Sequence, residues 1–273
     1  MTTGDRTGAA PRLALNVSLV FTELPLAERF TAAAELGFRG VELQFPYATP
    51  AATLARAARR AEVDIALINV PAGDLLHGGT TPAADPDREA EFTAALAQCE
   101  TYVRELRPAC VNVLAGPRSA AHSRAHCLAV FRANLARTRD RFAPLGVTTV
   151  FEAINTVDMP GFLLDGTAAQ CRVLDALGDD HLRLQYDVYH MATMGEDIEG
   201  FVTRHAGRIG HVQFADVPGR GEPGTGTLDF AGVFAALDAG GYSGWLAAEY
   251  RPSVSSARSF DWLARPPFRA RLG

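Results

Sequence analysis

The feature that most constrains the fold is a regular alternation of short apolar segments with longer helical ones along the whole chain. Eight apolar segments, rich in β-branched residues, have the length and composition of buried strands. They lie at 13–18, 40–45, 64–70, 110–116, 147–153, 182–188, 209–215 and 244–250. Helices are predicted at 24–36, 50–61, 88–106, 119–142, 167–177, 198–205 and 229–239, and a last one begins near Ser255. This order predicts a single α/β domain, a parallel (β/α)8 TIM barrel.

An open, doubly wound sheet is the main alternative for such an alternation. That fold usually carries a G-x-G-x-x-G turn after an early strand, and none follows an early strand here. No linker or low-complexity block divides the 273 residues, so we expect one barrel domain over 13–273. Residues 1–12 lack apolar periodicity and are predicted to form a disordered leader.

Composition excludes several classes of protein. The net charge of −5 argues against a nucleic-acid or anionic-membrane partner, either of which favours a basic surface. No apolar run approaches the roughly 20 residues that span a bilayer, and we expect a cytoplasmic protein. All 26 basic residues are arginine. Schiff-base aldolases, pyridoxal-phosphate enzymes and carbamylated-lysine metal sites are therefore excluded, because each requires a lysine amine.

Four consecutive strands are predicted to end in a side chain with an oxygen donor: Glu152, Asp187, Gln213 and Glu249. Active sites of such barrels lie at the carboxyl ends of the strands, and strand alternation directs these four side chains inward. Three carboxylates placed together repel one another unless a cation lies between them. An all-oxygen ligand set favours Mg²⁺ or Mn²⁺ over zinc, so the sequence predicts a divalent metal site. For any one residue, the alternative is a helix cap or a solvated loop position.

The segments around these residues resemble the hydroxypyruvate isomerase family, which belongs to the sugar-isomerase-like TIM barrels. The motifs are EAIN at 152–155, DMPGF at 158–162, QYDVYHM at 185–191, GHVQFADVPGRGEPGTG at 210–226 and GW-x3-EYRP at 244–252. The likeness covers nearly the whole chain, including 16–47 and NVPAGD at 69–74. One departure is LLHGGTT after PAGD, where family members commonly carry GERG, so an arginine expected there is missing.

The resemblance implies a metal held by the same four residues. It also implies that Glu152 and Glu249 transfer protons and that His190 lies beside the substrate oxygens, where it binds one of them or transfers its proton; a structural role is the alternative for His190. Asn69 in NVPAGD is expected to contact the substrate. The implied reaction interconverts hydroxypyruvate and tartronate semialdehyde through an enediol, with a place in glyoxylate metabolism. Close relatives are assigned to 2-oxo-tetronate isomerisation, so that substrate or a related sugar acid is the alternative.

Binding a substrate carboxylate in a chain without lysine requires an arginine, a helix N-terminus or the metal itself. Arg220 lies in the glycine-rich loop after the seventh predicted strand, and we predict that it binds this carboxylate. Glycine-rich loops at this position bind phosphate in other barrels, so a phosphorylated sugar is an alternative ligand. A flexible lid that carries a solvated arginine is the third alternative.

Other titratable residues have predicted structural roles. His122, His126 and Cys127 include the i,i+4 spacing of metal ligands, but they are predicted to be surface and packing residues far from the barrel mouth, with no acid nearby. Glu42 is expected to point toward the barrel mouth and to form a structural ion pair, with contact to the substrate as the alternative. His211 is predicted to be a packed, hydrogen-bonded interior histidine.

Two other classes of function fit the sequence less well. A metal-dependent endonuclease on this barrel needs many histidines and a basic groove, whereas the chain has seven histidines and a negative net charge. A non-catalytic sugar-acid-binding protein has no need of both Glu152 and Glu249. We therefore predict an enzyme that acts on a small hydroxy or oxo acid. The sequence does not determine the oligomeric state, and a homo-oligomer is compatible with it.

Overall fold

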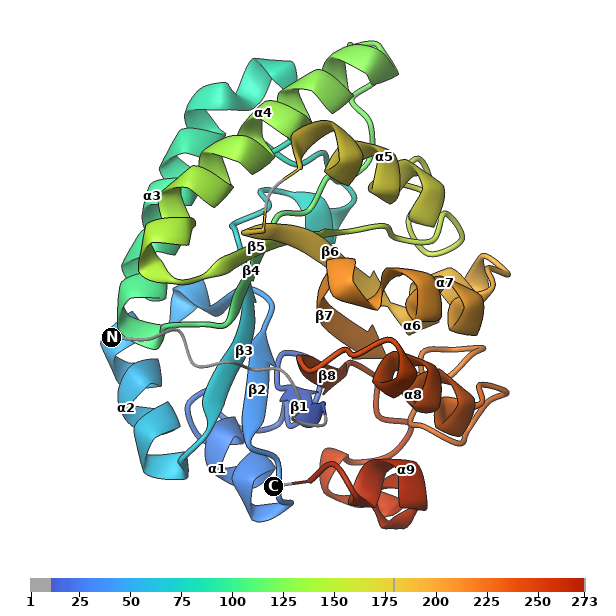
Figure 1. Ribbon diagram of the computed structural model, residues 1–273. Helices are drawn as coiled ribbons and strands as arrows, with labels where there is room; N and C mark the ends of the chain where they lie inside the picture. Colours follow the sequence, from blue (N-terminus) through green and yellow to red (C-terminus); the bar gives the residue numbers. More distant parts are fainter. Residues whose placement is uncertain (1–10, 179, 273) are drawn as a thin grey trace.

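The computed structural model describes residues 11–178 and 180–272, in which eight parallel strands close into a barrel in sequence order (Figure 1). The strands are β1 (Arg12–Asn16), β2 (Gly40–Leu43), β3 (Asp64–Asn69), β4 (Cys110–Asn112), β5 (Thr148–Glu152), β6 (Leu182–Asp187), β7 (Ile209–Phe214) and β8 (Trp245–Ala248). The single TIM barrel is thus confirmed. Residues 1–10 of the predicted leader lie outside the described residues, and Arg12 already belongs to β1.

Helices surround the barrel (Figure 1). They are α1 (Arg29–Glu35), α2 (Ala51–Ala61), α3 (Glu89–Leu106), α4 (Arg124–Phe142), α5 (Thr167–Leu177), α6 (Val188–Thr193), α7 (Ile198–His205), α8 (Phe230–Ala239) and α9 (Pro266–Arg269). Among the helices described here, none has the length and apolar character needed to cross a membrane.

Three helix predictions were wrong in their boundaries. Helix α1 begins five residues late, at Arg29, after a turn that contains Pro25. Helix α4 begins after Ser123, whose hydroxyl accepts a hydrogen bond from the His126 N–H at 3.2 Å and caps the helix. The segment predicted from Ser255 forms two short 3-10 turns before α9.

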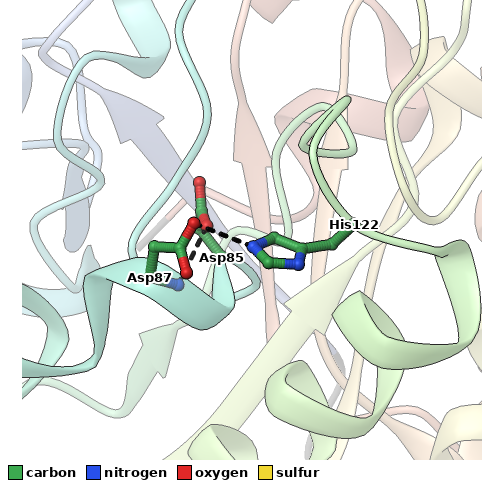
Figure 2. Close-up of side chains that lie close together, drawn as sticks. All are labelled: Asp85, Asp87 and His122. Carbon is green, nitrogen blue, oxygen red and sulfur yellow. Dashed lines mark hydrogen bonds and ion pairs between the residues drawn. The ribbon is translucent and has the colours of Figure 1, made fainter.

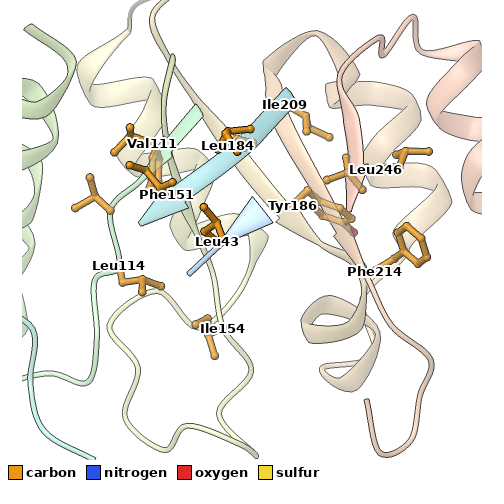
Figure 3. Close-up of a cluster of buried hydrophobic side chains, with 14 of the residues drawn as sticks. Leu43, Val111, Leu114, Phe151, Ile154, Leu184, Tyr186, Ile209, Phe214 and Leu246 are labelled. Carbon is orange, nitrogen blue, oxygen red and sulfur yellow. The ribbon is translucent and has the colours of Figure 1, made fainter. Parts of the chain in front are cut away.

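The strands separate two apolar regions. Phe151, Leu184, Phe214 and Leu246 point outward into the large core between barrel and helices, part of which is drawn in Figure 3. Val150 lies on the opposite face of β5, inside the barrel with Leu67 and Cys110. Because side chains alternate along a strand, Glu152 shares the inner face with Val150.

Trp245 fills the amino-terminal end of the barrel interior. It packs there with Ala14, Ala66 and Ala247. Gly40 leaves the space for its ring, since a Cβ at Gly40 would lie 2.7 Å from Trp245 Cζ3. This end of the barrel interior is therefore closed by packing, and the interior opens at the carboxyl ends of the strands.

Candidate active site

Every strand of the barrel places a buried polar side chain at or next to its carboxyl end. Five of these residues were singled out in the sequence as site candidates, and the structure adds Glu42 as a buried member of the ring. Asn16 and Asn112 were missed, although each is the last residue of its strand. The full ring is Asn16, Glu42, Asn69, Asn112, Glu152, Asp187, Gln213 and Glu249.

Strand register explains how the four predicted donors reach one level. Asp187 pairs directly with Gln213, whereas Glu152 pairs with Gln185 and Gln213 pairs with Ala247. Asp187 thus lies two residues beyond the partner of Glu152, and Glu249 lies two residues beyond the partner of Gln213. Strand tilt in a closed barrel requires such a stagger for side chains to meet at the same height.

Glu152 and Glu249 are buried carboxyls with raised pKa values. Burial is the main cause for both residues; nearby Glu249 and Asp187 raise the pKa of Glu152 further. Asn112 Nδ2 opposes this by donating to Glu152 Oε1 at 2.7 Å. The pKa of Glu249 is raised to about 8 by burial, against the opposing effect of Arg220. The pKa of Glu249 therefore lies close to the range that proton transfer near neutral pH requires.

Glu249 is held on both of its oxygens. Oε1 accepts hydrogen bonds from Asn16 Nδ2 at 3.1 Å and from the Gln44 side chain. Oε2 lies 2.7 Å from Arg220 Nη2. The carboxyl plane is therefore fixed by groups from three other parts of the barrel mouth.

Asp187 links the end of β6 to the histidine that follows it. Its Oδ1 accepts hydrogen bonds from the backbone N–H groups of Tyr189 and His190, at 2.8 and 3.3 Å, and so caps α6. Its Oδ2 lies 3.4 Å from His190 Nε2. This cap forms the short helix that the sequence prediction had missed.

His190 is a neutral imidazole in this environment, because burial lowers its pKa to about 4. Asn155 Nδ2 lies 2.6 Å from His190 Nδ1, while Asn155 Oδ1 accepts a hydrogen bond from the Asp158 N–H at 2.7 Å. With its amide in this orientation, Asn155 donates to Nδ1, and the ring proton resides on Nε2. His190 therefore presents an uncharged N–H donor beside Asp187.

Gln213 is oriented by a buried network beneath it. Its Nε2 donates to Glu42 Oε1 at 2.8 Å, and its Oε1 accepts from Gln185 Nε2 at 2.5 Å. Glu42 Oε2 lies 2.6 Å from His211 Nε2, and both side chains are fully buried. The prediction of a packed, hydrogen-bonded interior histidine at 211 is confirmed, and Glu42 is its partner in this buried contact.

A cavity of about 440 Å³ opens above this ring. The predicted residues Asn69, Glu152, His190, Gln213, Arg220 and Glu249 all line it. Asp187 lies beneath the cavity surface and contacts two of its lining residues, His190 and Arg220. Apolar side chains such as Phe45, Leu114 and Ile154 form much of the remaining wall. The candidate residues thus converge on one hollow.

Two of the residues that line the cavity, Asn69 and Arg220, already form side-chain contacts with other residues of the protein. Asn69 Oδ1 accepts from Asn112 Nδ2 at 3.2 Å, which leaves its amide N–H2 as the donor for a ligand. Arg220 Nη2 lies 2.7 Å from Glu249 and 3.6 Å from Asp187, and its guanidinium carbon lies 5.3 Å from the centre of the Tyr189 ring. Arg220 is thus a partly buried, anchored residue, which argues against the flexible-lid alternative.

The residues present fit a hard divalent cation. Glu152, Asp187 and Glu249 carry three acidic groups, and Arg220 is the one described cation in contact with any of them. The resulting excess of acid contributes to the raised pKa values, and a divalent cation would remove it. Carboxylate oxygens of Glu152 and Asp187 and a ring nitrogen of His190 lie within 4.8 Å of one another. Because Nε2 of His190 carries a proton and Nδ1 is bonded to Asn155, the two carboxylates are the ligands that this group offers. Glu249 lies outside this group, and Arg220 joins it to Asp187.

A second group with metal-ligand character lies apart from the cavity and consists of Asp85, Asp87 and His122 (Figure 2). His122 Nε2 lies 2.9 Å from Asp87 Oδ2, so the prediction that no acid is near this histidine was wrong. His122 also precedes α4 instead of belonging to it. The contact joins loops 35 residues apart in sequence, which is why local spacing did not reveal it. It ties the loop before α3 to the loop before α4.

Comparisons with known proteins agree with this geometry. A family model described as xylose isomerase-like TIM barrel matches residues 30–265. The hydroxypyruvate isomerase of Escherichia coli is 35% identical over 258 residues, which cover 94% of this chain and 99% of the relative. A 2-oxo-tetronate isomerase of Cupriavidus necator is 37% identical over 258 residues, with coverage of 93% and 97%. A crystal structure from Brucella melitensis, described as an AP endonuclease of family 2, has a TM-score of 0.89 at 33% identity and covers 93% of this chain and 98% of its own.

Proposed function

We propose that this chain, which belongs to the xylose isomerase-like TIM barrel family, interconverts hydroxypyruvate and tartronate semialdehyde. Its similarity to hydroxypyruvate and 2-oxo-tetronate isomerases makes it an isomerase. The observation that carries the proposal is the pair Glu152 and Glu249, two buried carboxyls with raised pKa values that line the same cavity. We also propose that it is a cytoplasmic enzyme of glyoxylate metabolism, as its likeness to hydroxypyruvate isomerase suggests.

Glu152, Asp187, Gln213 and Glu249 would hold a divalent ion, Mg²⁺ or Mn²⁺. Oxygen-only ligation by these side chains favours a hard cation. When bound, such an ion supplies Lewis-acid stabilisation of the negative charge that develops on the substrate oxygens. The hydrogen bonds from Gln185 Nε2 and to Glu42 Oε1 fix the orientation of the Gln213 side-chain amide.

Isomerisation requires removal of a proton from C3 of hydroxypyruvate and delivery of a proton to C2. Glu152 and Glu249 stand on strands separated by β6 and β7, so they can reach neighbouring carbons of one substrate. One carboxylate accepts the C3 proton and the other carboxyl donates a proton to C2, through an enediolate, while the hydroxyl proton passes from O3 to O2. The pKa of Glu249, raised to about 8, allows this carboxyl to exchange a proton near neutral pH, and burial raises the pKa of Glu152 in the same direction.

The neutral donors of the cavity stabilise the enediolate oxygens. His190 presents its Nε2–H without a positive charge, since its pKa lies at about 4. Asn69 offers its amide N–H2 from the end of β3. Arg220 holds Glu249 in position and lies beside the substrate oxygens. Such fixed donors act without reorganising as charge develops.

A four-carbon 2-oxo acid is the alternative substrate, and two observations favour keeping it. The Cupriavidus necator relative that bears the 2-oxo-tetronate name is as similar as the hydroxypyruvate isomerase of Escherichia coli. The cavity of about 440 Å³ also has room for one more carbon and its hydroxyl group. The barrel and the proton-transfer residues would serve both substrates.

Steady-state kinetics with both acids test the proposal. The protein is treated with EDTA, reconstituted with Mg²⁺ or Mn²⁺, and assayed with hydroxypyruvate and with 2-oxo-tetronate. We expect turnover only with metal, and the higher kcat/KM with hydroxypyruvate. A higher kcat/KM with the four-carbon acid would change the substrate and keep the mechanism. Binding of both acids without turnover of either would refute the enzymatic proposal.

A further inference from the structure

Two arginines line the cavity, and only one of them forms ion pairs with other described residues of this chain. Arg220 and Arg251 are the arginines that line it among the described residues. The Arg220 guanidinium is bound to Glu249 and Asp187 and lies over Tyr189. The exposed Arg251 side chain makes no hydrogen bond or ion pair with any residue in 11–178 or 180–272. An incoming anion therefore meets one free guanidinium.

The position of Arg251 in the chain directs it to the same hollow as Glu249. Both residues line the cavity, whereas Tyr250 between them is fully buried on the other side. The Tyr250 hydroxyl lies 2.8 Å from Ser259 Oγ, which fixes that side of the segment. Continued strand-like alternation past β8 thus places Arg251 about 7 Å beyond Glu249, toward the cavity mouth.

The backbone around Arg251 is also held from the neighbouring loop. The Arg251 N–H donates to the Arg220 carbonyl oxygen at 2.8 Å. Two residues later, Ser253 donates through its N–H and its hydroxyl to Glu222 Oε1, at 2.7 and 3.0 Å. Glu222 is buried. The base of the Arg251 side chain is therefore anchored before a ligand arrives, which lowers the ordering cost of binding.

We propose that Arg251 binds the substrate carboxylate and thereby makes the site selective for oxo acids over neutral sugars. This inference rests on the proposed function. A guanidinium pairs with a carboxylate through two parallel N–H···O bonds, and the chain has no lysine that could take this role. Arg220, for which the sequence predicted this role, instead positions Glu249.

Substrates that differ only in this charge test the assignment. Hydroxypyruvate and dihydroxyacetone share the hydroxyketone and differ by the replacement of the carboxylate with a hydroxymethyl group. For Arg251→Gln we expect KM for hydroxypyruvate to rise about a hundredfold with kcat changed less than about threefold. Its activity with dihydroxyacetone should be unchanged. Arg251→Lys should recover part of the affinity, because it restores the charge without the two-pronged geometry.

Two further variants separate this role from general damage. Arg258→Gln removes an exposed arginine from the same loop outside the cavity lining and should behave as wild type. Arg220→Gln should lower kcat with both substrates, because it releases Glu249. Binding of tartronate, an unreactive dicarboxylate, should weaken in Arg251→Gln and thus report the contact without turnover.

The possible failures are distinct. If the wild type isomerises neutral sugars and no oxo acid, the proposed function itself is wrong, before any variant is compared. If the wild type uses oxo acids and Arg251→Gln keeps KM and tartronate affinity within about twofold, only the role of Arg251 is wrong. An equal loss with hydroxypyruvate and dihydroxyacetone would likewise overturn selectivity for the carboxylate.

Discussion

In the metal-free protein, the free energy of unfolding should decrease as the pH rises. Burial raises the pKa of Glu249 to about 8, against an ordinary value of 4.5. Between these two values the folded chain keeps a proton that the unfolded chain has lost. The free energy of unfolding must then fall with increasing pH, and the contribution present at about pH 4.5 is lost by about pH 8.

The size of this effect follows from proton linkage. One proton retained only by the folded state changes stability by about 1.4 kcal/mol per pH unit. From about pH 5 to about pH 8, Glu249 alone should therefore lower the free energy of unfolding by about 4 kcal/mol. The raised pKa of Glu152 acts in the same direction. A bound divalent cation stabilises both ionised carboxylates and should abolish this loss.

Urea unfolding of the EDTA-treated protein at several pH values measures the slope. The Glu249→Gln variant should lose the part of the slope that Glu249 causes. The difference between its slope and the wild-type slope therefore measures Glu249 apart from other titrating groups. Glu105→Gln, at an exposed position on α3, is the matched control and should keep the wild-type slope. Equal slopes for wild type and Glu249→Gln would refute the reasoning, as would a metal-free protein whose stability rises across this range.

Three other substitutions have defined outcomes. Asn112→Leu removes the amide bonded to Glu152 and should cost about 1–3 kcal/mol in urea unfolding; a smaller cost would mean that Glu152 does not depend on this donor. His190→Asn should lower kcat by about a hundredfold in the hydroxypyruvate assay with the fold intact by circular dichroism, and an unchanged kcat would leave the histidine structural. Gly40→Ala drives a Cβ against Trp245 and should cost about 1–3 kcal/mol without changing KM, whereas a stability equal to wild type would show that the ring can shift.

The sequence predicted the barrel and the residues at its mouth for the same reason. Strands in a closed parallel barrel are buried on both faces, so their apolar runs stand out, and polar residues at their ends are exceptions to the pattern. Glu152, Asp187 and Gln213 were visible as such exceptions, and the asparagines at 16 and 112 carried the same signal. They were missed because an amide at a strand end has no strong chemical implication alone. Gln213 was singled out because carboxylates end the strands on both sides of it, and Asn69 through the family resemblance.

Contacts between loops could not be predicted in this way. Arg220 faces Glu249 because its backbone adopts φ +57° after Gly219 at φ +95°, in a turn that side-chain patterns do not specify. The pairing of Ser253 with Glu222 likewise depends on how two loops meet. Helix α6 was missed because it has six residues, too few for an apolar period, and its cap at Asp187 had been assigned to the metal site alone.

The most direct test of the account is proton exchange during turnover. Hydroxypyruvate is incubated in D₂O with metal-loaded protein and followed by proton NMR, with metal-free protein and Glu152→Gln as controls. We predict metal-dependent formation of tartronate semialdehyde, with solvent deuterium entering at the exchanging carbon, and no reaction in either control. Full turnover by Glu152→Gln, or by the metal-free protein, would contradict an enediolate mechanism carried by these glutamates and a divalent cation.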